Sequence, residues 1–164
     1  MFGVINIYSQ SKNEIARKLS NFYSHSFVFE GQSFPCFESF LQCLKFSDPD
    51  EQIAVASMDA KEAKKKGQTR NWQASGYLYW SGQPINRYGK EYQELLARAY
   101  DALCTNQVFA EALCRSRGKL LIHTIGKLRK RNTVLTSFEF CKILVQKRRK
   151  LLRKTDSISL NVTT

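Results

Sequence analysis

Near its N-terminal end the chain reads Phe29-Glu30-Gly31-Gln32-Ser33-Phe34-Pro35-Cys36-Phe37-Glu38. The Glu30-Gly31 pair separates two short runs rich in aromatic residues, which predicts a β-hairpin over residues 26–34. Pro35 ends the hairpin because proline has no backbone N–H to donate to a strand. A helix is expected to begin just after it.

Between Phe37 and Phe46 the apolar side chains repeat at the spacing of a helix. Glu38, Gln42 and Lys45 occupy positions i, i+4 and i+7 of this segment, so they share one face of that helix. This face is either a solvated polar stripe or the wall of a cleft. In the second case the Glu38 carboxylate would act near a phosphate held by Lys45.

The segments on either side extend the same mixed pattern. Residues 76–89 are aromatic and rich in turn residues, which indicates a structured loop. Further strands are expected over residues 4–8 and 120–122. Further helices are expected from the Asp59-x-x-Glu62 capping signal to near Gly67, over residues 92–103, after Asn106, and from the Thr136-x-x-Glu139 capping box onward. The prediction is a helix-dominated α+β fold with a small N-terminal β-sheet, as one domain over residues 1–154. A polar tail, expected to be frayed, follows over residues 155–164.

Length and composition agree with this outline. The chain has 164 residues, which fits a single domain, and 43% of them are hydrophobic, which excludes wholesale disorder. No apolar run approaches the roughly 18 residues of a membrane helix, and the N-terminus does not resemble a secretory signal. We therefore expect a cytoplasmic protein that does not associate with a membrane.

The pattern of cysteines and the absence of known nucleotide-binding motifs suggest neither a metal nor a cofactor. Five cysteines are an odd number, and they form no C-x-x-C pair and have no neighbouring histidine, which argues against zinc and against a disulfide framework. Their neighbours are apolar, so we expect small buried side chains. The sequence contains no P-loop and no Gly-rich dinucleotide motif.

Positive charge is concentrated in the C-terminal quarter. The net charge is +12, and residues 115–154 hold fourteen Lys and Arg against the single acid Glu139. Such a segment favours phosphate, either in a polyanion such as DNA or RNA or in a smaller phosphorylated ligand. The alternative is a solvated helix face with a solubilising function.

Several short motifs follow one another in the N-terminal half. They are, in order, Ser20-Asn21-Phe22, Gly31, Phe34-Pro35-Cys36-Phe37-Glu38, Gln42 and Lys45-Phe46. The set resembles the NADAR (YbiA-like) family, which has a Ser-Asn-Phe segment, a glycine, an aromatic-Pro-x-x-Glu motif and a Gln-x-x-Lys-Phe motif in the same order. The similarity continues through residues 63–64 and 69–72 and spans roughly residues 6–149.

This resemblance implies a helix-rich α+β fold and hydrolysis of an N-glycosidic bond to a phosphorylated ribose. The substrates it suggests are ribosylated pyrimidine intermediates of riboflavin synthesis and ADP-ribose attached to guanine in nucleic acid. Glu38 matches the catalytic glutamate of the family, Asn21 and Phe22 match the segment that lines the pocket, and Lys45 matches the lysine of the Lys-Phe pair. Both Trp72 and Trp80 can be aligned with the functional tryptophan.

The chemistry of such a reaction suits these residue types. Cleavage of a C1′–N bond builds positive charge on the ribose, and a carboxylate such as Glu38 can stabilise this charge or activate water. An indole such as Trp72 or Trp80 can stack on the base, and the Asn21 carboxamide can bind ribose hydroxyls. Lys45 or the C-terminal cations would neutralise phosphates. The alternative for either tryptophan is core packing.

The C-terminal part departs from the family pattern. The second acidic residue and a Trp-Gly pair are absent, and the basic run Lys127–Arg131 stands where an acid would be expected. His123 is a candidate acid or base in its place, since the pKa of an unperturbed imidazole lies near 6.5. A structural histidine is the alternative. The missing acid also motivates a second hypothesis, a non-catalytic module that binds ADP-ribose or nucleic acid; a protein-interaction domain is a third and weaker one.

Overall fold

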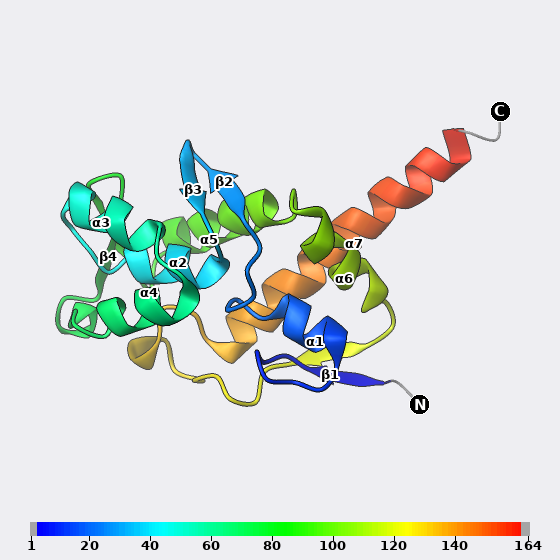
Figure 1. Cartoon of the computed structure of the whole chain (residues 1–164), viewed down its shortest axis with the longest axis horizontal. Coiled ribbons are helices and arrows are strands. Elements are labelled where there is room, and N and C mark those ends of the chain that lie inside the picture. Colours follow the sequence, from blue (N-terminus) through cyan, green and yellow to red (C-terminus); the bar gives the residue numbers. More distant parts are fainter. Residues whose placement is uncertain (1–2, 162–164) are drawn as a thin grey trace.

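The computed structural model describes residues 3–161, and side chains as far as Ser157. Helices dominate, as expected for the α+β class (Figure 1). They are α1 (Glu14–Leu19), α2 (Phe37–Cys43), α3 (Pro49–Ala56), α4 (Ala60–Gly67), α5 (Lys90–Leu103), α6 (Gln107–Arg115) and α7 (Ser137–Asn161), with 3₁₀ turns η1 (Trp72–Ala74) and η2 (Lys130–Asn132). None of the helices in this part of the chain is long and apolar enough to cross a membrane.

The strands form three two-stranded ladders instead of a single N-terminal sheet. Strand β1 (Val4–Asn6) pairs in parallel with β6 (Leu120–Ile122), which joins the two ends of the domain. The expected hairpin is present as β2 (Phe27–Phe29) and β3 (Gln32–Phe34), with positive φ angles at Glu30 and Gly31. Both turn residues therefore adopt the left-handed conformation that tight hairpins require.

A third ladder corrects the expectation of a loop over residues 76–89. Strands β4 (Tyr77–Trp80) and β5 (Gln83–Asn86) form a second antiparallel hairpin. Its turn, Ser81-Gly82, also has two positive φ angles, as a tight hairpin requires. Pro84 is tolerated in β5 because this strand has a free edge.

The predicted helix caps are confirmed by their hydrogen bonds. Asp59 and Glu62 form a reciprocal capping box at the start of α4, and Asn106 accepts from the Phe109 N–H at the start of α6. Thr136 and Glu139 form a second capping box before α7, with distances of 2.8 Å and 3.1 Å between each backbone nitrogen and the opposing side-chain oxygen.

Helix α7 runs further than expected. It continues through Asn161 and projects away from the body of the molecule (Figure 1). The prediction of a frayed tail is therefore wrong for residues 155–161, which are helical. The hydroxyls of Thr155 and Ser157 donate to the carbonyls of Leu151 and Arg153, four residues earlier, and thus bond within the helix. Residues 162–164 of the predicted tail lie outside the described residues.

The core surrounds α2, whose seven residues are all buried. Helices α3 and α4 pack against it, and its aromatic side chains meet those of the β2–β3 hairpin and Trp80. Cys36 and Cys43 belong to this buried interior, and the five cysteines are free thiols. A helix buried on every side has to bury its polar face as well, and this creates the site described next.

Candidate functional site

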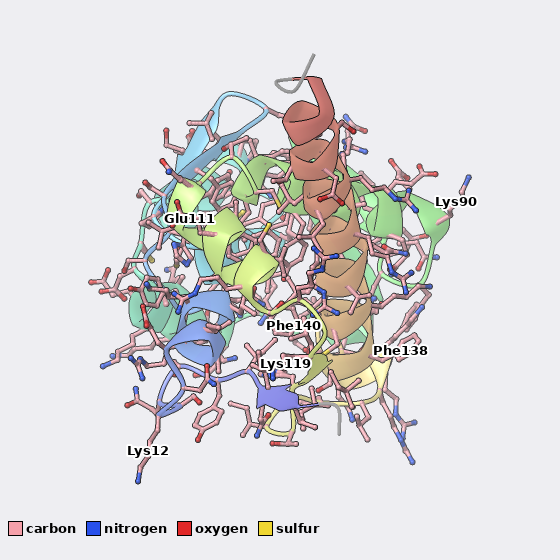
Figure 2. All side chains as sticks on the ribbon, turned by 90° about the vertical axis from the view of Figure 1, so that its right-hand side faces the viewer. Lys12, Lys90, Glu111, Lys119, Phe138 and Phe140 are labelled. Atoms are coloured by element: carbon pink, nitrogen blue, oxygen red, sulfur yellow. The ribbon has the colours of Figure 1, made fainter. Side chains whose placement is uncertain are left out.

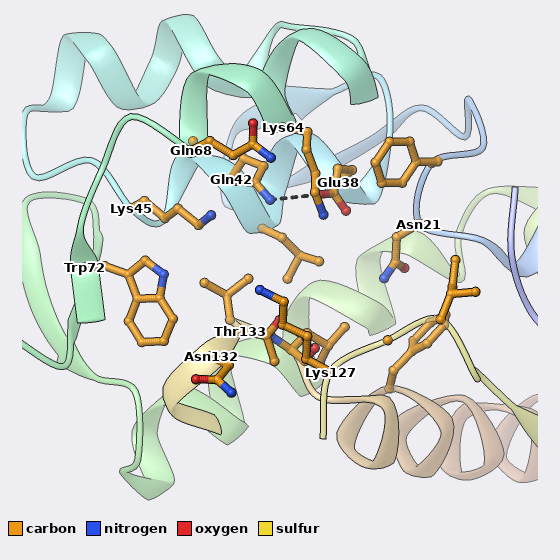
Figure 3. Close-up of a pocket in the computed structure, with 18 of the residues that line it drawn as sticks. Asn21, Glu38, Gln42, Lys45, Lys64, Gln68, Trp72, Lys127, Asn132 and Thr133 are labelled. Atoms are coloured by element: carbon orange, nitrogen blue, oxygen red, sulfur yellow. Dashed lines mark hydrogen bonds and ion pairs between the residues drawn. The ribbon is translucent and has the colours of Figure 1, made fainter. Parts of the chain in front are cut away.

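A cavity of about 710 Å³ opens between α2, α4 and the loop that joins β6 to α7 (Figure 3). Its walls come from segments far apart in the sequence: residues 8–9, 20–22, 38–45, 64–73, 123–127 and 132–135, together with Phe140. This volume lies within the range of small-molecule sites. A second hollow, of about 270 Å³, lies beside the β2–β3 turn. Cys43 of α2 lines this hollow and not the cavity, and no described residue lines both.

Glu38 lies in the wall formed by α2, and only 5% of it is exposed. Its carboxylate accepts a hydrogen bond of 2.7 Å from the Gln42 amide and lies 3.5 Å from the Lys64 ammonium. Its own N–H donates to the Asn21 carbonyl, which ties α2 to the neighbouring segment. Of the two alternatives for this helix face, the solvated stripe is therefore wrong and the cleft wall is confirmed.

Gln42 is held in place by a close approach of α4. A Cβ atom at Gly67 would overlap the Gln42 side-chain oxygen, so only glycine leaves room for the amide at this position. With Nε2 directed at Glu38, Oε1 has no hydrogen-bond partner among the described residues. Unpaired buried oxygens are costly, and this one belongs to a residue that lines the cavity.

The cavity is rich in cations and poor in acids. Lys45, Lys64, Arg70 and Lys127 line it, and among the described lining residues Glu38 is the single carboxylate. Figure 3 shows Lys45 and Lys127 reaching in from opposite walls. Arg70 is engaged by Glu51 at 2.7 Å and 2.8 Å, whereas the Lys45 ammonium makes no hydrogen bond or ion pair with any described residue. The site is thus suited to an anion.

Burial lowers the pKa of Lys45 to about 8; Glu38 opposes the shift, and Lys64 and Lys127 add to it. Below that pH the ammonium is charged and attracts phosphate; above it the amine becomes neutral. We expect the Kd for ADP-ribose to rise by several-fold between pH 7 and pH 9.5, as isothermal titration calorimetry would measure. The variant Lys45→Met should bind more weakly at pH 7 and lose this rise. A rise of equal size in the variant would contradict Lys45 as its source.

Asn21 and Phe22 both line the cavity, as the resemblance implied. The Asn21 Oδ1 accepts from the Tyr100 hydroxyl at 2.9 Å, and its amide is directed into the cavity (Figure 3). The Phe22 ring lies 5.6 Å from the Lys64 ammonium. These contacts fix one polar donor and one apolar surface close to Glu38.

The structure separates the two tryptophans. Trp72, in η1, lines the cavity opposite Lys127 (Figure 3). Trp80 does not, and its expected place at the substrate is wrong for this cavity. On β4 its side chain alternates inward, packs on Phe29 and Phe40, and donates from Nε1 to Glu30 at 2.6 Å. Trp80 is a core residue because strand alternation places it on the buried face of β4, together with Leu78.

His123 lies at the edge of the cavity after β6. Its Nδ1 contacts the Ile7 carbonyl at 2.6 Å, and because a carbonyl can only accept, Nδ1 carries the proton. The ring packs edge-on to Phe140, and Gly126 lies so close that a Cβ atom there would overlap it. These contacts fix the ring and leave Nε2 as the nitrogen able to accept a proton.

Much of the basic C-terminal segment is engaged in the fold. Lys147 and Lys150 both pair with Asp101, at 2.9 Å and 2.8 Å. Arg148 donates to the carbonyls of Ser116 and Lys119, and thereby ties α7 to the end of α6. Lys127 is the cation of residues 115–154 that lines the cavity.

Several lining residues were not found in the sequence as site residues: Lys64, Gln68, Asn132 and Thr133. Lys64 reaches Glu38 only because α4 packs on α2, and no spacing in the sequence announces this contact. Within the described residues, no group of three His, Cys, Asp or Glu side chains is placed to hold a metal ion. The candidate site thus consists of one carboxylate, several ammonium groups, amides and an indole.

Comparison with known proteins agrees with this architecture. Residues 13–149 match the family described as bacteriophage protein GP30.3. A protein of Enterobacteria phage T4, described as an uncharacterized 17.1 kDa protein in the Gp30-rIII intergenic region, is 36% identical over 129 residues, which are 77% of this chain and 85% of that protein. The NMR structure of the E. coli protein YbiA resembles this one with a TM-score of 0.65 at 16% identity, over 94% of this chain and 88% of that chain.

The likeness to YbiA, at this low identity, is a likeness of fold and confirms the expected helix-dominated α+β architecture. The family match covers most of the domain, including α2, α4 and the loop that closes the cavity. The chain therefore belongs to the bacteriophage GP30.3 protein family.

Proposed function

We propose that this protein is an N-glycosidase that hydrolyses the C1′–N bond between a phosphorylated ribose and a base. The observation that carries the proposal is the buried Glu38 carboxylate, held by Gln42 in a cavity lined by ammonium groups. The motif resemblance to the NADAR (YbiA-like) family and the fold likeness to YbiA support it. The substrates considered are ADP-ribose on a nucleobase, such as guanine in nucleic acid, and a ribosylaminopyrimidine phosphate.

In the proposed reaction the electron pair of the C1′–N bond leaves with the base, and positive charge develops on the ribose. The Glu38 carboxylate stabilises this charge and accepts a proton from the attacking water, whose oxygen bonds to C1′. The base then takes up a proton from solvent, and Glu38 returns to solvent the proton that it accepted, which restores the carboxylate. Gln42 keeps the carboxylate oriented, and a fixed position is what makes such a group effective.

Other lining groups provide the binding surface. In this proposal Lys45 and Lys127, which line the cavity, neutralise phosphates, and the Asn21 amide binds ribose hydroxyls. Trp72 offers an indole on which a base can stack.

A binding module without chemistry is the alternative. It is motivated by the absence of a second carboxylate among the described lining residues. Such a protein would bind ADP-ribose or nucleic acid and form no product.

The test is to incubate the protein with ADP-ribosylated guanine in DNA and, separately, with a ribosylaminopyrimidine phosphate. Mass spectrometry then follows release of the free base or the free sugar phosphate. Release of either product supports the glycosidase and selects its substrate class. Saturable binding of both compounds without release, by a folded protein, would instead support the binding module.

A further inference from the structure

The loop between β6 and α7 lines the cavity in two places, which are separated by residues that do not line it. Lys127 and Asn132 line the cavity, whereas the four residues between them do not. Those four residues, Leu128-Arg129-Lys130-Arg131, are all exposed, and we call them the rim loop. The Ser137 N–H donates to the Lys127 carbonyl and Lys130 begins the η2 turn, so the rim loop is anchored at the start of α7.

The cations of the rim loop are largely unpaired. Lys130 lies 3.8 Å from Glu139, a carboxylate that Arg87 already holds, and neither Arg129 nor Arg131 has a side-chain hydrogen bond or ion pair among the described residues. This separates the rim loop from Lys147, Arg148 and Lys150, which are engaged in the fold.

A second row of exposed cations stands on the other side of the cavity. Helix α4 carries Lys61, Lys64, Lys65 and Lys66, all exposed, and Lys64 itself lines the cavity. Figure 3 places Lys64 and Lys127 on opposite walls. The mouth therefore lies between two basic surfaces, one on α4 and one on the rim loop.

Large apolar side chains accompany the rim loop. Leu128 is 79% exposed and Phe138, in the first turn of α7, is 71% exposed. Figure 2 shows Phe138 pointing away from the molecule, whereas Phe140 points inward. Exposed aromatic and aliphatic groups beside unpaired cations are typical of surfaces on which bases stack while the backbone follows the charges.

We propose that a nucleic-acid strand crosses the mouth of the cavity, with its phosphates on the rim loop and α4 and its modified nucleotide in the cavity. This inference rests on the proposed function and assigns the surface that would hold a strand on either side of the modified nucleotide. The diphosphate of an ADP-ribosyl group is matched by Lys45, Lys64 and Lys127 inside. The rim-loop arginines then remain for flanking phosphates. The cavity is a concave pocket, so a target base has to be out of the stack to enter it, which favours a single strand.

The first test measures binding of a fluorescein-labelled, unmodified single-stranded DNA by fluorescence anisotropy over a range of salt concentrations. The variant Arg129→Gln/Arg131→Gln removes two rim-loop charges. The matched control Arg149→Gln/Arg153→Gln removes two exposed arginines from α7. We expect the rim variant to weaken binding about tenfold at low salt and to reduce the slope of log K against log salt by about 1.4, since each single-strand phosphate contact contributes roughly 0.7. The control should leave both nearly unchanged.

An equal loss of DNA affinity in the two variants would overturn the proposal, because the affinity would then depend on the net charge of the protein or on contacts with α7. Absence of binding by the wild-type protein would also overturn it.

A second measurement separates this inference from the proposed function. Cleavage of an ADP-ribosylated guanosine mononucleotide should be the same in wild type and in the rim variant, whereas cleavage of the same base within an oligonucleotide should fall about tenfold in kcat/KM in the rim variant. If the rim variant cleaves both substrates as efficiently as the wild type does, the strand contact is overturned and the glycosidase activity is supported. Rim-dependent DNA binding with cleavage of neither substrate would keep the strand contact and reject the glycosidase.

Discussion

Replacement of Glu38 by Gln is expected to lower the turnover number by about 10³-fold or more, which is within the contribution of a positioned acid or base. The substitution keeps the size of the side chain, and the amide oxygen that it introduces can still accept from the Gln42 amide, which contacts the Glu38 Oε1 at 2.7 Å. What it removes is the negative charge that would stabilise the ribosyl cation and take a proton from water. The measurement is single-turnover release of the base, with substrate binding measured in parallel.

A matched control is Glu94→Gln, which removes one carboxylate from α5 at an exposed position away from the cavity. Its turnover should equal that of the wild type. Retention of wild-type turnover by Glu38→Gln, with an unchanged melting temperature, would reject Glu38 as the catalytic carboxylate. Loss of turnover accompanied by loss of folding would require the comparison to be repeated with Glu38→Asp, which keeps the charge and moves it back by one methylene.

Glu139→Gln is expected to lower the free energy of unfolding by about 3 kcal/mol at pH 7. Glu139 forms two hydrogen bonds with the fully buried Arg87, at 3.0 Å and 2.7 Å. Arg87 also donates to the Thr133 carbonyl, so the pair fixes the wall of the cavity. Without the carboxylate the guanidinium would stay buried and lack its counter-charge.

The same pair predicts a specific pH dependence. Burial alone would raise the pKa of Glu139, but hydrogen bonds from Arg87 and from the Thr136 N–H lower it from 4.5 to about 2. A carboxyl whose pKa is lower in the folded state stabilises the protein above its unfolded pKa. This contribution is lost as the pH falls from about 4.5 to about 2. The measurement is urea unfolding of wild type and Glu139→Gln between pH 7 and pH 2.

We expect the difference between these two proteins to shrink over that interval. The matched control is Glu111→Gln, at an exposed position on α6, and its stability should follow that of the wild type. If the difference in the free energy of unfolding between wild type and Glu139→Gln stays constant down to pH 2, the ion pair is not the source of that difference.

Local patterns predicted most of the helices, because they depend on neighbours in the chain. The capping boxes at Asp59 and Thr136 marked two helix starts, since their hydrogen bonds span three residues. The hairpin at Glu30-Gly31 was recognised from its turn residues. The second hairpin, whose Ser81-Gly82 turn has the same geometry, was not predicted, because the aromatic and turn residues of 76–89 were interpreted as a structured loop.

The sequence by itself determined the polar face on which Glu38, Gln42 and Lys45 lie, because 3.6 residues per turn place them together wherever the helix packs. Tertiary structure alone decided that this face is buried against α4, that Lys64 reaches Glu38, and that Trp72 lines the cavity while Trp80 packs in the core. Those outcomes depend on contacts between segments tens of residues apart. Burial and charge at such contacts depend on which helix covers which, and no spacing along one segment carries that information.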